Sequence, residues 1–303
     1  MKITKVEAIP IRQKTAIQAI NDSSQDGLIV RIQTDAGITG YGEVDSAPWV
    51  CKAIIESPAS HRMAMGLARV VVGRDPYDVE KIWNDMYKFS IFYGQHGAVI
   101  HAMSGIDIAI WDILGKAQDK PIWQLLGGKY RSKVRAYAST LMPYTPEEAY
   151  QETKKWVDAG YTAIKLGWGG FEQDENTQVE LVRAAREAAG EDVDLLFDIG
   201  FLPSDRLTID APSRIQLVKR FEPYHPYAIE EALWPHDYEG YRKLSEGTNT
   251  RIVCGENETT RFGFKTLIEY GKVAFVQPDI SRCGGFTETK KIAALADLHS
   301  INV

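Results

Sequence analysis

The segment Asp194-Leu195-Leu196-Phe197-Asp198-Ile199 is a short apolar run with a carboxylate near its end. Between two helical patterns, such a run is typical of a buried strand in a parallel sheet. The same pattern recurs through the second half of the chain, at residues 134–139, 163–166, 227–230, 251–255 and 274–278, and another begins at 301–303. Repeated strand–helix units of this kind predict a parallel α/β sheet.

Helix-start signals support this reading of the second half. Thr145-Pro146-Glu147-Glu148 has the form of a capping box with proline in the first turn, and Asp210 precedes a later helix with Pro212 near its start. An open doubly wound sheet is the alternative to a barrel, but its G-x-G-x-x-G phosphate turn is not seen. A (β/α)₈ barrel usually needs about 200 residues or more, whereas this region has only about 180. We therefore expect a modified TIM-type barrel over residues 126–303 that is incomplete at its C-terminal end.

The first part of the chain has a different pattern. Strands are predicted at residues 1–11, 26–34 and 38–44, with a turn at Asp35-Ala36-Gly37, and together they form a β-meander. Helical patterns follow at residues 78–87 and 98–118. Residues 1–125 are therefore expected to form a separate α+β domain.

Composition excludes several classes of protein. The 303 residues carry a formal net charge of −6 and contain no run of Lys or Arg, which argues against nucleic acid as a partner. The N-terminus lacks the apolar core of a signal peptide, and no membrane span is expected. The three cysteines, Cys51, Cys254 and Cys283, are widely spaced and suggest no disulfide framework. A cytoplasmic protein is the expectation.

Charged residues recur where the predicted strands end. In a (β/α) barrel, the C-terminal ends of the strands face one shared pocket. Carboxylates that converge there repel one another unless a cation neutralises them, and oxygen ligands suit Mg²⁺ or Mn²⁺. The competing interpretation is that each acidic residue simply caps the following helix. The residues concerned are Lys165, Asp198, Glu230, Glu231, Glu256 and Asp279.

Six segments, taken in order, resemble those of the enolase superfamily, in its mandelate racemase-like branch, and the resemblance covers nearly the whole chain. It implies an α+β capping domain over a modified barrel, with the polar, irregular segments Lys14–Gln25 and Asp45–Ser60 closing the site and setting specificity. The matching segments are residues 102–112, Leu125-Leu126-Gly127-Gly128, Ile229-Glu230-Glu231, Gly255-Glu256, Gln277-Pro278-Asp279 and Gly284-Gly285.

The resemblance also implies a ligand set for Mg²⁺. Asp198, Glu230 and Glu256 would hold the metal, and Glu231 would lie beside these ligands or serve the structure. The substrate carboxylate would bind the same ion. A metal in this place stabilises the charge that develops when a proton leaves the carbon next to a carboxylate.

The proton-transfer groups depart from the family pattern. A Lys-x-Lys pair usually ends the second barrel strand; here Lys165 matches the first lysine, and Gly167 stands in place of the second. Lys165 could accept the proton or contact the substrate carboxylate, and a base role requires its pKa to fall from the free value of about 10.4. Asp279 resembles the aspartate of a His–Asp dyad, whose histidine we expect beyond Val303, because His299 is poorly placed.

One further position departs from the family pattern, and three further residues are candidates for contacts with the substrate. Gly200 stands where the family often has Asn. Trp168, Arg282 and His236 are candidate substrate-binding residues, although barrel packing, ion pairing and a surface loop, respectively, explain them as well.

The preferred function is dehydration of an acid sugar, an aldonate or aldarate, through an enediolate intermediate. Racemisation, epimerisation or cycloisomerisation of a carboxylate is the alternative, and a non-catalytic binding protein with the same fold is the third possibility. The expected partner is a small carboxylate, and a homo-oligomer is the expected assembly.

Overall fold

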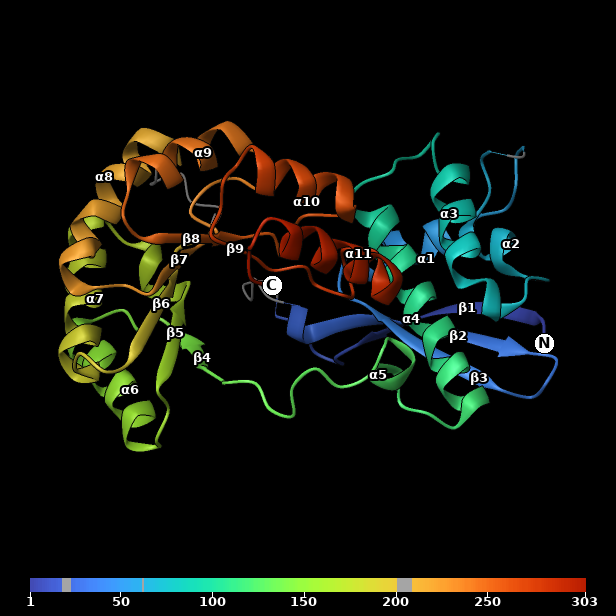
Figure 1. Ribbon diagram of the computed structural model, residues 1–303, viewed down its shortest axis with the longest axis horizontal. Helices are drawn as coiled ribbons and strands as arrows, with labels where there is room; N and C mark the ends of the chain where they lie inside the picture. Colours follow the sequence, from blue (N-terminus) through green and yellow to red (C-terminus); the bar gives the residue numbers. More distant parts are fainter. Residues whose placement is uncertain (18–22, 62, 201–208) are drawn as a thin grey trace. The chain divides into compact units, whose positions relative to one another are not determined.

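A computed structural model describes residues 1–17, 23–61, 63–200 and 209–303 (Figure 1). The chain folds into two compact units, and each unit is assembled from three stretches of sequence. The first unit contains Met1–Ser132, Glu256–Phe264 and Pro278–Leu295. The second contains Lys133–Gly255, Lys265–Gln277 and Ala296–Val303.

The first unit is built on the predicted β-meander. Its antiparallel strands β1 (Ile3–Arg12), β2 (Asp26–Thr34) and β3 (Thr39–Val44) pair in sequence order. Alternate β2 residues, among them Leu28, Val30 and Ile32, are fully buried, as expected for a sheet with one face on the core. The helices of this part of the chain are α1 (Pro48–Glu56), α2 (Leu67–Val71), α3 (Val79–Phe89), α4 (Ala98–Gln118) and α5 (Ile122–Leu125).

Helix α4 is the core helix of this unit. It lies directly on β3, where a Cβ atom at Gly42 would come within 2.0 Å of the Gly105 carbonyl oxygen, so this close approach requires glycine. By length and composition alone α4 could cross a membrane, although no membrane span is expected from the sequence. However, 72% of its apolar window is buried inside the protein, and a core helix accounts for that composition.

The segment Asp45–Ser60 differs from its prediction. It was expected to be irregular, but residues 48–56 form α1, with Pro48 in the first turn. Only Pro48, Cys51 and Ile55 of this helix are buried, so its apolar face is narrow and its periodicity weak. Within the other predicted loop, Lys14–Gln25, residues 18–22 lie outside the described residues.

The second unit contains a six-stranded parallel sheet in sequence order, β4-β5-β6-β7-β8-β9. This order confirms barrel-type winding, since the strand order of a doubly wound sheet reverses at a switch point. Asn302 pairs in parallel with Phe275, so the predicted last strand also joins the sheet. The strands are β4 (Ala138–Leu141), β5 (Ala163–Gly167), β6 (Asp194–Asp198), β7 (Ala228–Glu230), β8 (Arg251–Cys254) and β9 (Phe275–Val276).

Most strand boundaries agree with the sequence patterns, but β4 is displaced. The strand predicted at residues 134–139 lies at 138–141, and Val134 is 77% exposed. An apolar residue in an extended connection can mimic the start of a strand.

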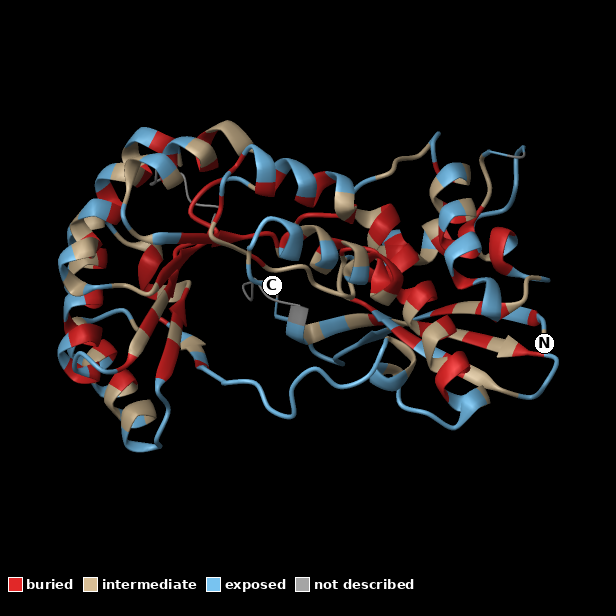
Figure 2. Ribbon diagram, viewed as in Figure 1, coloured by how far each residue is buried: buried red, intermediate tan, exposed pale blue. Residues whose placement is uncertain are grey.

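Helices cover one face of the parallel sheet (Figure 1). Thr145 and Asp210 cap their helices as predicted, accepting hydrogen bonds from the backbone amides of Glu148 and Ser213. Strands β5, β6 and β7 of this sheet are largely buried (Figure 2). The helices within this unit are α6 (Pro146–Asp158), α7 (Glu175–Ala189), α8 (Ala211–Phe221) and α9 (Tyr238–Gly247), whereas α10 (Thr260–Glu269) and α11 (Gly285–Leu298) contain residues of both units.

Candidate active site

Asp198 and Glu230 end neighbouring parallel strands and lie opposite each other. Asp198 is the last residue of β6, Glu230 is the last residue of β7, and the two are direct partners in the register. Both are buried, with 4% and 2% of their surface exposed. Two buried carboxylates side by side repel each other unless a cation lies nearby.

Lys165 supplies positive charge to this pair. It lies in the middle of β5, and its Nζ is 2.5 Å from Glu230 Oε1 and 3.4 Å from Asp198 Oδ2. Burial alone would lower the pKa of Lys165, but the charges of Glu230 and Asp198 outweigh this effect and raise it. In this arrangement Lys165 is a charged ammonium group.

The Glu230 carboxylate has spare capacity to bind a cation. Its Oε1 contacts Lys165, while its Oε2 is buried without a hydrogen-bond partner among the described residues. A buried carboxylate oxygen without a partner is costly, and a hard divalent cation is a suitable partner for it. The carboxylates of Asp198 and Glu230 therefore fit the donor set of a Mg²⁺ or Mn²⁺ site.

The backbone takes uncommon conformations immediately after the strands. Trp168 follows β5 with φ of 55°, and Glu231 follows β7 with φ of 47°. Both are left-handed conformations that cost energy in non-glycine residues and concentrate at functional sites. The Glu231 carboxylate accepts a 2.7 Å hydrogen bond from the Gly255 amide, so this side chain links the ends of β7 and β8.

Two glycines make room beside Asp198. A Cβ atom at Gly167 would lie 2.8 Å from Asp198 Cβ, so the Asp198 side chain occupies the space that a residue at 167 would need. A Cβ atom at Gly200 would lie 3.3 Å from the indole Nε1 of Trp168. The departures from the family pattern at these two positions thus coincide with space filled by Asp198 and Trp168.

Glu256, Asp279 and Arg282 belong to the first unit. Glu256 Oε1 accepts a hydrogen bond from the Asn257 side chain, at 3.1 Å. Asp279 accepts from the backbone and hydroxyl of Ser281, at 2.7 and 2.6 Å. Arg282 forms an ion pair with Asp45, with 2.8 Å between Arg282 Nη2 and Asp45 Oδ2.

The structure groups only some of the predicted site residues. Lys165, Asp198 and Glu230 come together in the second unit, whereas Glu256 lies in the first, and its place beside them stays a prediction. In the part of the chain that is described, no three His, Cys, Asp or Glu side chains are grouped so as to hold a metal ion. His236 is exposed and packs near Tyr238, and His299 pairs with Glu269.

Comparison with known proteins identifies the family. Residues 2–127 match the mandelate racemase/muconate lactonizing enzyme N-terminal domain, and residues 148–303 match the enolase C-terminal domain-like family. The chain belongs to the enolase superfamily. The resemblance inferred from its motifs is therefore confirmed.

Relatives of this enolase-superfamily chain include proteins named as sugar-acid dehydratases. It is 33% identical to an L-rhamnonate dehydratase of Saccharopolyspora erythraea over 91% of this chain and 66% of that protein. It is 34% identical to a D-galactonate dehydratase of Pectobacterium atrosepticum, over 90% of this chain and 69% of that one. The chain thus spans about two thirds of the length of these relatives.

Solved structures agree with this assignment. The 3,6-anhydro-D-galactonate cycloisomerase of Zobellia galactanivorans superimposes with a TM-score of 0.83 at 30% identity, covering 100% of this chain and 79% of that one. An enolase-superfamily member from Salmonella Typhimurium gives 0.83 at 31% identity, covering 99% and 79%.

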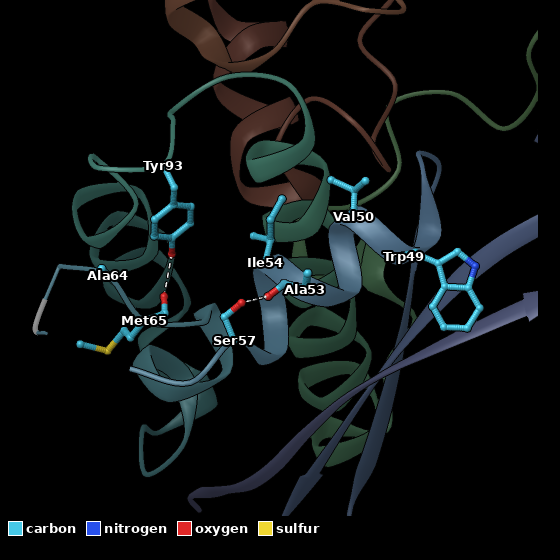
Figure 3. A pocket seen from close by; sticks show the side chains of 8 residues that line it. All are labelled: Trp49, Val50, Ala53, Ile54, Ser57, Ala64, Met65 and Tyr93. Atoms are coloured by element: carbon cyan, nitrogen blue, oxygen red, sulfur yellow. Dashed lines mark hydrogen bonds between the residues drawn. The ribbon is translucent and has the colours of Figure 1, made fainter. Parts of the chain in front are cut away.

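Two cavities of this enolase-superfamily chain have neither Asp198 nor Glu230 among their lining residues. One, of about 340 Å³, is lined by residues at strand starts, such as Ala163 and Asp194, and by residues farther along strands, such as Leu196 and Val253. The strand starts of a (β/α) barrel usually serve stability. The other, of about 620 Å³, is an apolar pocket of the first unit between α1 and Tyr93, with Trp49, Ile54 and Met65 among its lining residues (Figure 3).

Sequence reasoning missed Asn257 and Asp45 as neighbours of the predicted site residues. Asn257 directly follows Glu256, and this adjacency was the only available signal. Asp45 is 237 residues from Arg282, and nothing in the local pattern links the two.

Proposed function

We propose that this chain removes the proton next to a substrate carboxylate and, in doing so, dehydrates an acid sugar. The observation that carries the proposal is the Lys165 ammonium held against the buried carboxylates of Asp198 and Glu230 at neighbouring strand ends. The names of the relatives, L-rhamnonate and D-galactonate dehydratase, support an aldonate as the substrate class.

In the proposed site, Asp198, Glu230 and Glu256 hold Mg²⁺, and Mn²⁺ is an acceptable substitute. When bound, the divalent ion supplies positive charge that stabilises the electrons left behind as the α-proton departs. The chain's own contribution includes buried, low-dielectric strand ends that fix the carboxylates of Asp198 and Glu230 before substrate arrives. Glu231, tied to the Gly255 amide, keeps the ends of β7 and β8 together beside them.

As the charged ammonium found here, Lys165 is proposed to contact the substrate carboxylate from β5, whereas the role of proton acceptor would require its pKa to fall below the raised value that Glu230 and Asp198 give it. No second lysine accompanies it, because Gly167 occupies the position where the family usually has one. Elimination is therefore proposed over racemisation by two facing bases. Asp279 is the proposed orienting partner of a catalytic histidine, and Trp168, Arg282 and His236 remain predicted substrate contacts.

The test is incubation of the protein with Mg²⁺ and a panel of aldonic and aldaric acids that includes L-rhamnonate and D-galactonate. Dehydration yields a 2-keto-3-deoxy acid, which a carbonyl-specific assay detects. Exchange of the α-proton in D₂O without loss of water would favour the epimerase alternative. Metal binding without exchange or product across the panel would favour a binding protein and contradict the proposal.

A lysine variant sharpens this test. Lys165→Met should lower turnover by roughly 10²–10⁴-fold, the usual contribution of a positioned acid–base group. Loss of α-proton exchange in D₂O together with turnover would assign the base role, whereas retained exchange with a raised KM would assign the carboxylate contact. Lys155→Met is the matched control, since Lys155 pairs with Glu152 on the surface of the same unit.

The cytoplasm is the proposed compartment, in keeping with three buried cysteines that form no disulfide. A small carboxylate is the proposed partner, and a homo-oligomer the proposed assembly.

A further inference from the structure

Arg282 connects separate segments of the first unit. Its Nη2 forms an ion pair with Asp45 Oδ2 at 2.8 Å, and its Nε donates to the Asp45 carbonyl oxygen at 3.2 Å. Its Nη1 donates to the side-chain oxygen of Asn257, also at 3.2 Å. Three nitrogens of one guanidinium group are therefore engaged, two of them with a single aspartate.

The contact continues from Asn257 to a predicted metal ligand. The amide oxygen of Asn257 accepts from Arg282, and its Nδ2 donates to Glu256 Oε1 at 3.1 Å. Each end of the amide thus has a defined partner, which fixes its orientation. A continuous path of side-chain hydrogen bonds leads from Asp45 through Arg282 and Asn257 to Glu256.

The far end of this path is anchored. Asp45 lies between β3 and α1, and the next residue, Ser46, is 2.8 Å from His101 Nδ1 on α4. The side chains of Arg282 and Asp45 are only 21% and 25% exposed, so solvent screens their ion pair less than it would at the surface. The guanidinium is held against a fixed part of the unit.

We propose that Arg282 is a positioning residue, which orients the Glu256 carboxylate through Asn257 and ties it to Asp45. This inference rests on the proposed function, because it takes Glu256 as a metal ligand. Residues that hydrogen-bond to a metal-ligating side chain typically contribute 10–100-fold to metal affinity or activity. A planar guanidinium reaches Asp45 and Asn257 together, whereas a lysine ammonium is a point charge that cannot reproduce this fork.

Direct titration with Mn²⁺ in the absence of substrate tests the proposal. Arg282→Gln should weaken Mn²⁺ binding by about 10-fold or more, and Arg282→Lys should restore little of that loss. The matched control is Arg74→Gln, which removes an arginine of the same unit that pairs with Asp85 and donates to a backbone carbonyl. That control should leave Mn²⁺ affinity unchanged.

A double-variant cycle tests whether Arg282 acts through Asn257. Asn257→Ala should weaken Mn²⁺ binding to a similar extent, and Arg282→Gln added to it should cause little further loss, because both changes break one path. Asn257→Ala also keeps the test informative if Arg282→Gln does not fold.

The outcomes separate this inference from the proposed function. Wild-type protein that binds no Mn²⁺ overturns both. Wild-type protein that binds Mn²⁺, together with Arg282→Gln or Asn257→Ala protein that binds it equally well, overturns only the positioning role. Fully additive losses in the double variant also overturn it.

Discussion

At the scale of single residues, the absence of a side chain shapes the candidate site as much as its charges do. Gly167 is the register partner of Asp198, and the Asp198 side chain fills the space beside it. Gly200 lies two residues after Asp198, and its amide donates to Asp198 Oδ1 at 3.2 Å. Both glycines lie beside the Asp198 carboxylate. Only at Gly167 would an added Cβ atom meet an atom attached directly to the backbone, the Cβ of Asp198.

The two glycines should therefore respond differently to alanine. Gly167→Ala places a Cβ atom 2.8 Å from Asp198 Cβ. The Asp198 Cβ atom can move away only if the backbone of β6 moves with it, so we expect the unfolding free energy to fall by about 1–3 kcal/mol. The displaced Asp198 should also bind Mn²⁺ more weakly. Gly200→Ala meets side-chain atoms at 3.2 and 3.3 Å, which can yield, and should cost less. Urea unfolding and Mn²⁺ titration of both variants measure these effects; equal losses would contradict the argument.

At the scale of secondary-structure elements, α4 binds the N-terminus of α11. Ser104 Oγ accepts from the Gly284 amide at 2.9 Å, and Asp107 Oδ2 accepts from the Thr287 amide at 3.0 Å. Amides at a helix start have no partner within their own helix, so side chains of another helix satisfy them here. This contact gives a physical reason for the Ser-Gly-Ile-Asp segment and the Gly284-Gly285 pair, which the sequence analysis used only as family markers.

Asp107 makes this contact dependent on pH. Burial raises the pKa of Asp107 from 3.8 to about 7, although hydrogen bonds from Thr287 act in the opposite direction. The folded protein therefore holds a proton that the unfolded chain releases, and stability should decrease as pH rises from about 4 to about 7, then level off.

Asp107→Asn removes this titration and keeps an acceptor oxygen for the Thr287 amide. Between pH 5 and pH 8 the wild type should lose on the order of 3 kcal/mol more unfolding free energy than the variant. Urea unfolding at the two pH values measures the difference. Asp112→Asn, at a partly exposed carboxylate of the same helix, is the control and should behave like wild type. A variant at position 107 with the wild-type pH dependence would disprove the role of this carboxyl group.

At the scale of the whole molecule, the first unit is not continuous in sequence. Residues 256–264 and 278–295 belong to it although they follow most strands of the parallel sheet in the sequence. They bring acceptors to two tryptophans: Trp83 Nε1 donates to the Gly284 carbonyl oxygen and Trp111 Nε1 to Thr287 Oγ1, at 2.8 and 2.9 Å. The stability of this unit therefore depends on residues far along the chain.

A fragment of residues 1–132 should reveal this dependence. It lacks the partners of Trp83, Ser104, Asp107 and Trp111, four hydrogen bonds worth about 1 kcal/mol each. We expect broad urea unfolding and red-shifted tryptophan emission compared with the full chain. A sharp transition with unshifted emission would show that these residues fold without the returning segments.

Local periodicity explains what could be predicted from the sequence. The β-meander, α4, the capping residues Thr145 and Asp210, and the alternation of strands and helices depend on neighbours a few residues apart, and the structure contains them all. The expectation that charged residues gather at strand ends follows from the same alternation, because parallel strands align their C-terminal ends. Asp198 and Glu230 meet that expectation, and Lys165 reaches them from the middle of β5. Helix α1 was not predicted, because only three of its residues are buried and its apolar periodicity is weak.

Contacts across long separations were beyond the reach of the sequence. Local patterns carry no information about which distant residue fills a given space. Only the packed structure shows three contacts: Arg282 with Asp45, Asn257 with Glu256, and Asp198 beside Gly167. The composition of the chain determined which chemical groups were available and roughly where along the strands they stand. Three-dimensional packing determined which of them touch, because side-chain contacts depend on distances through space that no spacing along the chain encodes.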